Sequence, residues 1–258
     1  MFDALNQVDL AFVVDTTGSM GAFIGAARQH MIALLRALAE GAGTRPDLRL
    51  AVVEYRDHPP QDNSFVARPH AFEANLARCQ KVINNLKPDG GGDTPEAVYD
   101  GLQTACDQLD WRPHSCRLAV LVGDSPPHGT GCGGDGFRNG CPCGLTTERV
   151  TALLETKGIT LYALGLTPHV RNSFTPLAAW TGGEYFEAAQ AQKAIDALRE
   201  LLANEFAGID LDRQVLDLCR QTPEWTVDGV SEALSSGRPR VAASLSRLGR
   251  RGLLAAPA

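Results

Sequence analysis

The sequence predicts an α/β fold, with a doubly wound, mostly parallel sheet flanked by helices and a small helical domain at the C-terminus. Three observations support this prediction. Short apolar runs of strand length alternate with segments of helical periodicity through about the first 208 residues. These runs are almost continuously apolar, as expected for a parallel sheet covered on both faces. From residue 209 onward only helical patterns follow, so we predict domains at 1–208 and 209–258.

Each predicted element follows from such a pattern. The strands are Leu10–Val14, Leu48–Glu54, Leu118–Gly123, Thr160–Gly165 and Glu184–Phe186, with a short edge strand near Ser64–Val66. The helices between them are Gly21–Ala39, Ala74–Leu86, Glu96–Leu109, Thr147–Thr156, Val170–Trp180 and Gln190–Phe206. Three short amphipathic helices follow at Leu211–Cys219, Trp225–Leu234 and Arg238–Leu248. Ligands of such sheets bind beyond the carboxyl ends of the strands.

Composition narrows the class of protein. The chain has 258 residues, 44% of them hydrophobic, and a net charge of −6, which excludes a strongly basic nucleic-acid binder as a whole. The charge is uneven, with −7 on residues 1–208 and +1 on residues 209–258. The N-terminal residues lack the pattern of a signal peptide, and no apolar stretch approaches the ~18 residues of a membrane span. We therefore expect a cytoplasmic protein without a membrane partner.

The loop after the first predicted strand contains candidate metal ligands. Asp15, Thr17 and Ser19 place one carboxylate and two hydroxyl groups in a short run. All three offer hard oxygen atoms, which Mg²⁺ prefers at distances of about 2.1 Å. One anionic and two neutral ligands would leave the ion electrophilic, with positions open for a carboxylate of a partner. The alternative for this stretch alone is an ordinary turn that caps the following helix.

Two further segments supply matching oxygen atoms. Thr94 follows a run of three glycines and precedes a predicted helix, and Asp124 ends the strand Leu118–Gly123. In this order the residues resemble the metal-ion-dependent adhesion site of von Willebrand factor A domains, whose pattern is Asp-x-Ser-x-Ser, a distant Thr and a later Asp. Thr17 replaces the commoner Ser but keeps the hydroxyl. Asp93, beside Thr94, is an alternative residue to face the metal.

The resemblance covers about Val8–Ala207. It implies a Rossmann-like fold and a protein partner that completes the coordination of the metal with a carboxylate. It also implies that Mg²⁺, or alternatively Mn²⁺, binds at Asp15, Thr17, Ser19, Thr94 and Asp124. The phrases Tyr55–Asp62, Gly123–Gly129 and Gly140–Gly144 resemble A domains of the α-kinase-associated type, which also occur alone in bacterial proteins. Because the sequence given contains no kinase domain, kinase activity is not inferred.

A glycine-rich loop, Gly129–Gly144, carries a second set of candidate ligands. His128, Cys132, Cys141 and Cys143 are four soft ligands that could bind Zn²⁺ tetrahedrally. The Cys-x-Cys spacing is tighter than the usual zinc knuckle. A redox-sensitive cysteine pair and an ordered loop without a metal are the two alternatives.

The C-terminal helices resemble the helix-turn-helix core of a winged-helix domain. We predict that Val241, Leu245 and Leu248 are buried against Leu216, Val230 and Leu234, because helices this short need to bury their apolar stripes against one another. Arg238, Arg240 and Arg247 would then face solvent, where they could contact nucleic acid. A helical appendage that binds protein, or packs on the A domain, is the alternative.

These observations favour a non-enzymatic, metal-dependent protein-binding module of adhesion or scaffold type. No phosphate-binding loop and no Gly-x-Ser-x-Gly element is present in the sequence. One alternative is a regulator whose C-terminal helices bind DNA while the A domain senses a partner. Another is a hydrolase in which the metal activates water, which would need an open metal position and a general base.

Overall fold

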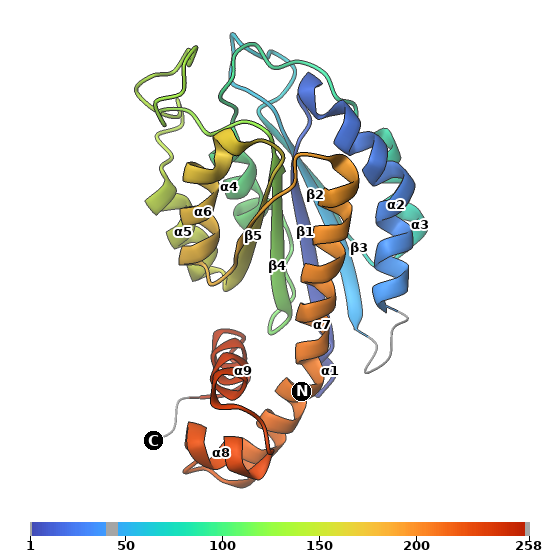
Figure 1. Cartoon of the computed structure of the whole chain (residues 1–258), viewed down its shortest axis with the longest axis vertical. Coiled ribbons are helices and arrows are strands. Elements are labelled where there is room, and N and C mark those ends of the chain that lie inside the picture. The colour runs from blue at the N-terminus through green and yellow to red at the C-terminus, as the bar shows by residue number, and fades with distance from the viewer. Residues whose placement is uncertain (1, 40–45, 256–258) are drawn as a thin grey trace.

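The computed structural model describes residues 2–39 and 46–255. Its centre is a six-stranded sheet in the order β3-β2-β1-β4-β5-β6 (Figure 1). Neighbouring strands are parallel except β3, which runs antiparallel to β2 at one edge. The strands are β1 (Gln7–Asp15), β2 (Asp47–Tyr55), β3 (Ala67–Glu73), β4 (Cys116–Gly123), β5 (Ile159–Gly165) and β6 (Tyr185–Glu187). The predicted α/β fold with a mostly parallel sheet is confirmed.

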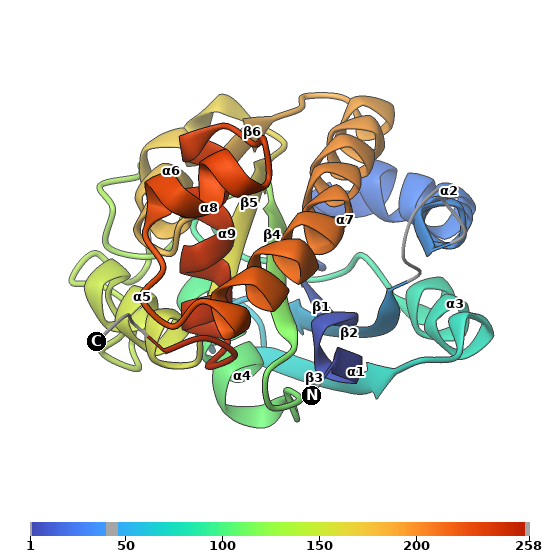
Figure 2. The ribbon, with the colours of Figure 1, turned by 90° about the horizontal axis from the view of Figure 1, so that it is seen from below.

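Helices cover both faces of this sheet (Figures 1 and 2). One face is covered by α2 (Gly21–Ala39), α3 (Leu76–Asn85) and α7 (Ala191–Gln221), and the other by α4 (Val98–Gln108), α5 (Thr147–Thr156) and α6 (Arg171–Trp180). Successive side chains of a strand point to opposite faces. Phe12 and Val14 of β1 therefore pack with the first set, and Ala11 and Val13 with the second.

Short elements complete the domain. They are α1 (Phe2–Leu5) and two 3-10 turns, η1 (Gly18–Met20) and η2 (Pro168–Val170). The carboxyl ends of the parallel strands point toward the upper end of Figure 1, away from the N-terminus. The loops that carry the predicted metal ligands lie at this end. Among the residues that the structure describes, no helix is both long enough and apolar enough to cross a membrane.

The edge strand was predicted three residues too early. The expected strand at Ser64–Val66 is a turn, because the backbone N–H and the hydroxyl of Ser64 both donate to Oδ1 of Asp62 at 2.7 and 2.5 Å. These local bonds replace a strand ladder at that point. The antiparallel strand β3 begins directly afterwards, at Ala67.

The helices predicted at Gln190–Phe206 and Leu211–Cys219 are one continuous helix, α7. Gly208 was expected to lie in a break, but a single glycine costs a helix only about 1 kcal/mol and does not end it. Here the missing side chain has a packing role, since a Cβ on Gly208 would lie 3.1 Å from Nη2 of Arg247. The proposed boundary between residues 208 and 209 falls inside α7.

The end of α7 carries two further helices, α8 (Val227–Ala233) and α9 (Arg238–Arg250), at the end of the molecule opposite the metal-ligand loops (Figure 1). They form a separate apolar cluster with α7 and with Leu5 of α1. Val241, Leu245 and Leu248 are buried there with Leu216 and Val230, and the partly buried Leu234 packs against them. This predicted packing is confirmed.

Candidate functional site

The first cluster of oxygen ligands forms where β1 ends. Oδ1 of Asp15 accepts hydrogen bonds from the backbone N–H of Thr17 at 2.8 Å and from its hydroxyl at 2.6 Å. The hydroxyl of Thr17 also lies 3.4 Å from that of Ser19. Asp15 and Thr17 are buried and Ser19 is exposed. The loop thus brings these three predicted ligands together at the carboxyl edge of the sheet.

The glycine run after α3 packs closely on this loop. The N–H of Gly18 donates to the carbonyl of Gly90 at 3.2 Å, and the N–H of Asp89 donates to the carbonyl of Thr16 at 3.0 Å. Gly91 has a φ of +80°, and a Cβ there would lie 2.9 Å from Oε1 of Glu96 and 3.1 Å from Cβ of Thr17. Only glycine combines this backbone angle with so close an approach.

Glu96, to which the sequence analysis gave no role, lies beside these ligands. Its side chain is buried, and Oε2 has no hydrogen-bond partner among the described residues. Burial raises the pKa of Glu96 well above its ordinary value, and the surrounding carboxylates raise it further. Those carboxylates belong to Asp15, Asp57, Asp93 and Asp124. Glu96 therefore lies within a cluster of acidic side chains.

The same acidic environment acts on Asp15. Burial raises the pKa of Asp15 above its ordinary value. The hydrogen bonds from Thr17 lower this pKa, whereas the carboxylate of Asp124 raises it. Asp124 is half-buried and accepts a 3.1 Å hydrogen bond from Ser125. We call Asp15, Asp57, Asp93, Glu96 and Asp124 the acidic centre.

Thr94 and Asp93 differ in their surroundings. Thr94 is exposed, and within the described chain no hydrogen bond joins it to Asp15, Thr17, Ser19 or Asp124. Oδ2 of Asp93 accepts hydrogen bonds from the N–H of Gly136 at 2.6 Å and from Gln61 at 3.1 Å. The other oxygen of Asp93 is buried and has no hydrogen-bond partner in the part of the chain that the structure describes.

A buried histidine adjoins the acidic centre. Nε2 of His128 lies 2.7 Å from Oδ1 of Asp57, and Nδ1 lies 3.1 Å from Oδ1 of Asp135. Burial opposes the charged form of the ring, but the hydrogen bonds to both carboxylates raise the pKa of His128 above its ordinary value. The ligand atoms of Asp57, Asp93 and His128 lie within 4.8 Å of one another.

Comparison with known families identifies this architecture. A family model described as the von Willebrand factor A domain matches residues 9–113, which include most of β1 and all of β2, β3 and α4. Solved A domains share the fold over most of the chain. Residues 9–113 thus match the von Willebrand factor A domain model, and the fold of the chain is that of solved A domains.

Two curated relatives match this chain at low identity. The chain is 27% identical over 157 residues to alpha-protein kinase vwkA of Dictyostelium discoideum, covering 60% of this chain and 24% of that protein. It is 26% identical over 215 residues to an ariadne-like RING finger protein of Acanthamoeba polyphaga mimivirus, covering 77% of this chain and 21% of that protein. The chain therefore spans about a quarter or less of the length of these relatives.

Solved structures agree on the fold. Proximal thread matrix protein 1 from the mussel byssus, solved with a zinc-occupied adhesion-site motif, has a TM-score of 0.56 at 18% identity over 80% of this chain and 47% of that one. A von Willebrand factor type A protein from Catenulispora acidiphila has a TM-score of 0.55 at 17% identity, over 76% and 42% of the two chains. At such identities the likeness concerns the fold.

The structure of the cysteine-rich loop differs from its prediction. Cys141 and Cys143 lie together, but His128 is bonded to Asp57 and Asp135, and Cys132 is half-buried with its Sγ 3.7 Å from the carbonyl of Gly133. The predicted grouping of His128 and Cys132 with the two cysteines is therefore wrong. The loop turns back on itself, and a Cβ on Gly129 would lie 2.5 Å from Cα of Gly140.

The three predicted surface arginines also differ from one another. Arg238 is exposed and pairs with Asp228 at 2.9 Å, and Arg240 is exposed. Arg247 was expected to face solvent but is largely buried against Asp212 of α7, with an N–O distance of 2.6 Å. Asp212 is itself buried and needs a cation, which explains the inward orientation of Arg247.

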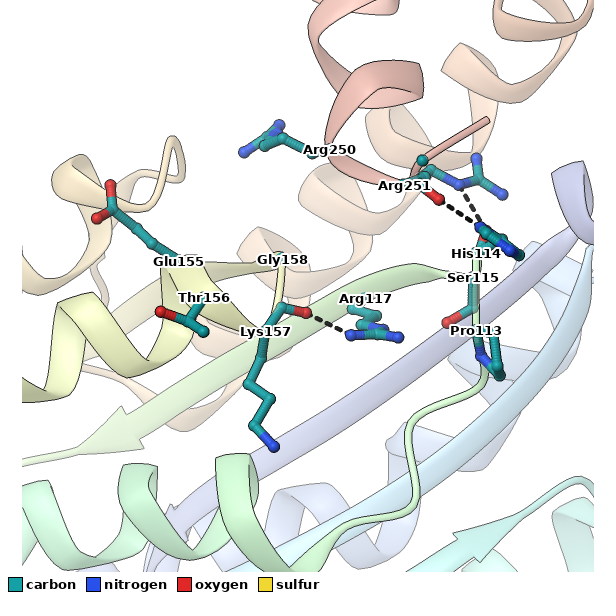
Figure 3. Close-up of a pocket in the computed structure, with 11 residues that line it drawn as sticks. Pro113, His114, Ser115, Arg117, Glu155, Thr156, Lys157, Gly158, Arg250 and Arg251 are labelled. Atoms are coloured by element: carbon teal, nitrogen blue, oxygen red, sulfur yellow. Dashed lines mark hydrogen bonds between the residues drawn. The ribbon is translucent and has the colours of Figure 1, made fainter. Parts of the chain in front are cut away.

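A basic pocket of 360 Å³ lies where the end of α9 meets β4 and the turn between α5 and β5 (Figure 3). Its arginines are already bonded to backbone carbonyls. Arg251 donates to the carbonyl of His114 at 2.9 Å, Arg117 to that of Lys157 at 2.5 Å and Arg250 to that of Thr181 at 3.1 Å. These bonds link α9, the neighbouring loops and the sheet, so we assign the arginines a structural role.

Proposed function

We propose that the A domain is a non-enzymatic protein-binding module that depends on a divalent cation, Mg²⁺ or Mn²⁺. The ion would bind Asp15, Thr17, Ser19 and Asp124, with Glu96 beside it and Thr94 as the remaining ligand that the resemblance implies. A carboxylate of a protein partner would complete the coordination. The ligands are hard oxygen atoms, as these two ions require.

One observation carries the proposal, namely the unpartnered carboxylate oxygens of the acidic centre. Oδ2 of Asp15, Oδ2 of Asp57, Oδ1 of Asp93 and Oε2 of Glu96 are buried and have no hydrogen-bond partner among the described residues. Buried carboxylates without partners are costly, and their mutual repulsion adds to the cost. A divalent cation bound at Asp15 and beside Glu96 would offset both penalties at those two carboxylates.

One solved structure with this fold holds a metal ion. The mussel byssus protein is described with zinc in its adhesion-site motif, which shows that this fold can hold a divalent ion at that place. The ion and the partner of the present chain are our proposal.

The test separates metal binding from partner binding. Calorimetric titration with Mn²⁺ should give one site in the wild type, and Asp15→Ala should weaken it at least tenfold. Asp196→Ala, an exposed carboxylate on α7, is the matched control and should bind as the wild type does. Equal Mn²⁺ binding by wild type and Asp15→Ala would overturn the proposal.

A second step concerns the partner. Immobilised wild-type chain should retain proteins from the native lysate in Mg²⁺ and release them in EDTA, and Asp15→Ala should not retain them. Proteins that are retained equally with and without EDTA would contradict a metal-dependent interaction.

A further inference from the structure

Four side chains from three separate segments meet below the cysteine-rich loop. They are His58 after β2, Asp100 in the first turn of α4, and Cys141 and Cys143 at the end of the loop. Nε2 of His58 lies 3.0 Å from Oδ2 of Asp100, and Sγ of Cys141 lies 3.1 Å from the same oxygen and 3.5 Å from Nε2 of His58. All four ligand atoms lie within 4.8 Å of one another.

These separations match a tetrahedral zinc site. Bonds of about 2.3 Å to sulfur and about 2.0–2.1 Å to nitrogen or oxygen place neighbouring ligands of a tetrahedron roughly 3.3–3.8 Å apart. The measured distances of 3.0–3.5 Å lie close to that range. Sγ of Cys143 lies within 4.8 Å of the other three atoms, so side-chain shifts of about 1 Å would place all four around one ion.

The burial of the ligands fits a structural site. His58, Asp100 and Cys141 are buried, and Cys143 is exposed at the surface of the cluster. Asp100 accepts hydrogen bonds from both thiols and from His58, so a single carboxylate joins all the other members. The ring of His58 also packs edge-on against Phe137 of the loop, at 5.8 Å between centroids.

We propose that Nε2 of His58, Oδ2 of Asp100 and the sulfur atoms of Cys141 and Cys143 bind one Zn²⁺ ion in a closed, structural site. Zinc binding would release the two thiol protons, so that the ion is held by two thiolates, a neutral imidazole and a carboxylate. This site is distinct from the acidic centre, where the ligands are oxygen atoms.

Such a site would fasten the cysteine-rich loop to the sheet and to α4. Seven of the residues between positions 129 and 144 are glycines, so the loop has few side chains of its own to bury. The same loop carries Asp135 and the N–H of Gly136, which bond to His128 and to Asp93 of the acidic centre. The zinc site would therefore hold the loop that borders the proposed binding edge.

Elemental analysis of the full chain tests this proposal. The chain is produced in zinc-supplemented medium without a histidine tag and purified under reducing conditions. We expect about one zinc per chain that resists mild EDTA, as is usual for a site closed by four protein ligands. The double variant Cys141→Ser, Cys143→Ser should retain at least tenfold less. Cys132→Ser, a change in the same loop outside the cluster, should retain the zinc, and so should Asp15→Ala.

Cobalt substitution of the wild type gives a second measurement, which does not depend on the folding of the double variant. Co²⁺ exchanged into the wild type should show a thiolate charge-transfer band and the visible absorption of a tetrahedral ion. Absence of both signatures would overturn the proposal. Loss of zinc in Asp15→Ala, or equal zinc in the wild type and the folded double variant, would place the metal elsewhere. A zinc-free chain that forms a Cys141–Cys143 disulfide when it is purified without reductant would also overturn the proposal, in favour of a redox pair.

Discussion

Thr17 holds Asp15 in one orientation through two hydrogen bonds to the same oxygen, Oδ1, at 2.8 and 2.6 Å. The other oxygen of Asp15, Oδ2, is buried without a partner among the described residues. The orientation is therefore fixed while one lone-pair-bearing oxygen stays available. Such a preset carboxylate is what a cation site needs, because a ligand fixed in advance loses little entropy on binding.

Asp15→Asn should separate the stability of the fold from that of the metal complex. In EDTA the variant should melt at the temperature of the wild type or above it, because a buried charge near Asp124 is removed. Mg²⁺ at 100 times its Kd should raise the Tm of the wild type by about 5–10 °C and leave the variant unchanged. Differential scanning calorimetry with and without Mg²⁺ measures both effects. A variant that unfolds early in EDTA would show that Asp15 has a structural role instead.

Glu96→Gln tests whether the buried carboxyl group beside the predicted ligands takes part in metal binding. Replacing this buried carboxyl group should stabilise the chain in EDTA by about 1–3 kcal/mol, because the folded chain no longer has to bury or protonate an acid there. It should also weaken Mn²⁺ binding at least tenfold, since the negative charge beside the ion is gone. Urea unfolding and calorimetric titration check the two effects, with the exposed Glu200→Gln of α7 as the control. Unchanged Mn²⁺ affinity would remove Glu96 from the site.

Gly91→Ala and Gly131→Ala form a matched pair. Both glycines have a positive φ, +80° and +82°, so each alanine should cost about 1–3 kcal/mol of backbone strain. A Cβ on Gly131 meets open space, whereas a Cβ on Gly91 would be crowded by Glu96 and Thr17. We expect Gly91→Ala to be less stable than Gly131→Ala and to lose metal binding, while Gly131→Ala keeps it. Equal effects in urea unfolding and Mn²⁺ titration would contradict the close packing of the two loops.

Asp9 provides a prediction about pH. Its buried carboxylate forms two 2.9 Å bonds with Arg49 and further bonds with Arg112. Burial alone would raise the pKa of Asp9, but the bonds from the two arginines hold it below the ordinary 3.8. Because the folded pKa is the lower one, this stabilisation is complete above about pH 4 and is lost as the pH falls through the folded value.

Asp9→Asn should therefore lower the unfolding free energy by about 3 kcal/mol at pH 7 and flatten its dependence on pH below about 4. Urea unfolding between pH 2.5 and 7 is the measurement. Asp47→Asn removes an exposed partner of Arg112 and should change stability by less than about 0.5 kcal/mol. An acid transition of unchanged steepness in Asp9→Asn would contradict this assignment.

The sequence predicted those features that depend on neighbours along the chain. The apolar run Leu10–Val14 and the polar loop that begins at Asp15 are local patterns, and both were predicted correctly. Glu96 was missed because an acidic residue at the start of a predicted helix is ordinary, and its burial arises only when the glycine run packs against it. In the structure Glu96 precedes α4, which begins at Val98. The signal available in the sequence was the clustering of acidic residues, because Asp93 and Glu96 both follow within seven positions of Asp89.

Long-range contacts explain the remaining errors. His58 meets Cys141 across 83 residues and Asp100 across 42, so no spacing within the cysteine-rich loop could reveal their grouping. Likewise, Gly208 resembles a helix break in the sequence, whereas its role is to admit the guanidinium group of Arg247 from another helix. Both cases depend on tertiary packing, which overrides local preference.

The last prediction compares two arginines of α9, the exposed Arg240 and the largely buried Arg247. It also tests the alternative that the C-terminal helices bind DNA. Asp212 accepts bonds from Ser244 at 2.6 Å and from Arg247 at 2.6 and 3.1 Å, and the exposures of the Arg247 and Asp212 side chains are 23% and 3%. Arg247→Met leaves the buried carboxylate without its cation, which should cost about 3 kcal/mol. Hydrogen exchange should then speed up across α9 while the central strands stay protected.

Arg240→Glu is the matched change on the exposed face of the same helix, and its stability should stay within about 0.5 kcal/mol of the wild type. If the C-terminal helices bind DNA, this variant should weaken binding and reduce the slope of log K against log salt by about one. If they serve packing and protein contacts, DNA binding is absent in the wild type as well. Loss of DNA binding in Arg247→Met alone would reflect a displaced α9, because Arg247 is committed to Asp212. Electrophoretic mobility shifts at several salt concentrations, run on both variants beside the exchange experiment, decide between these roles.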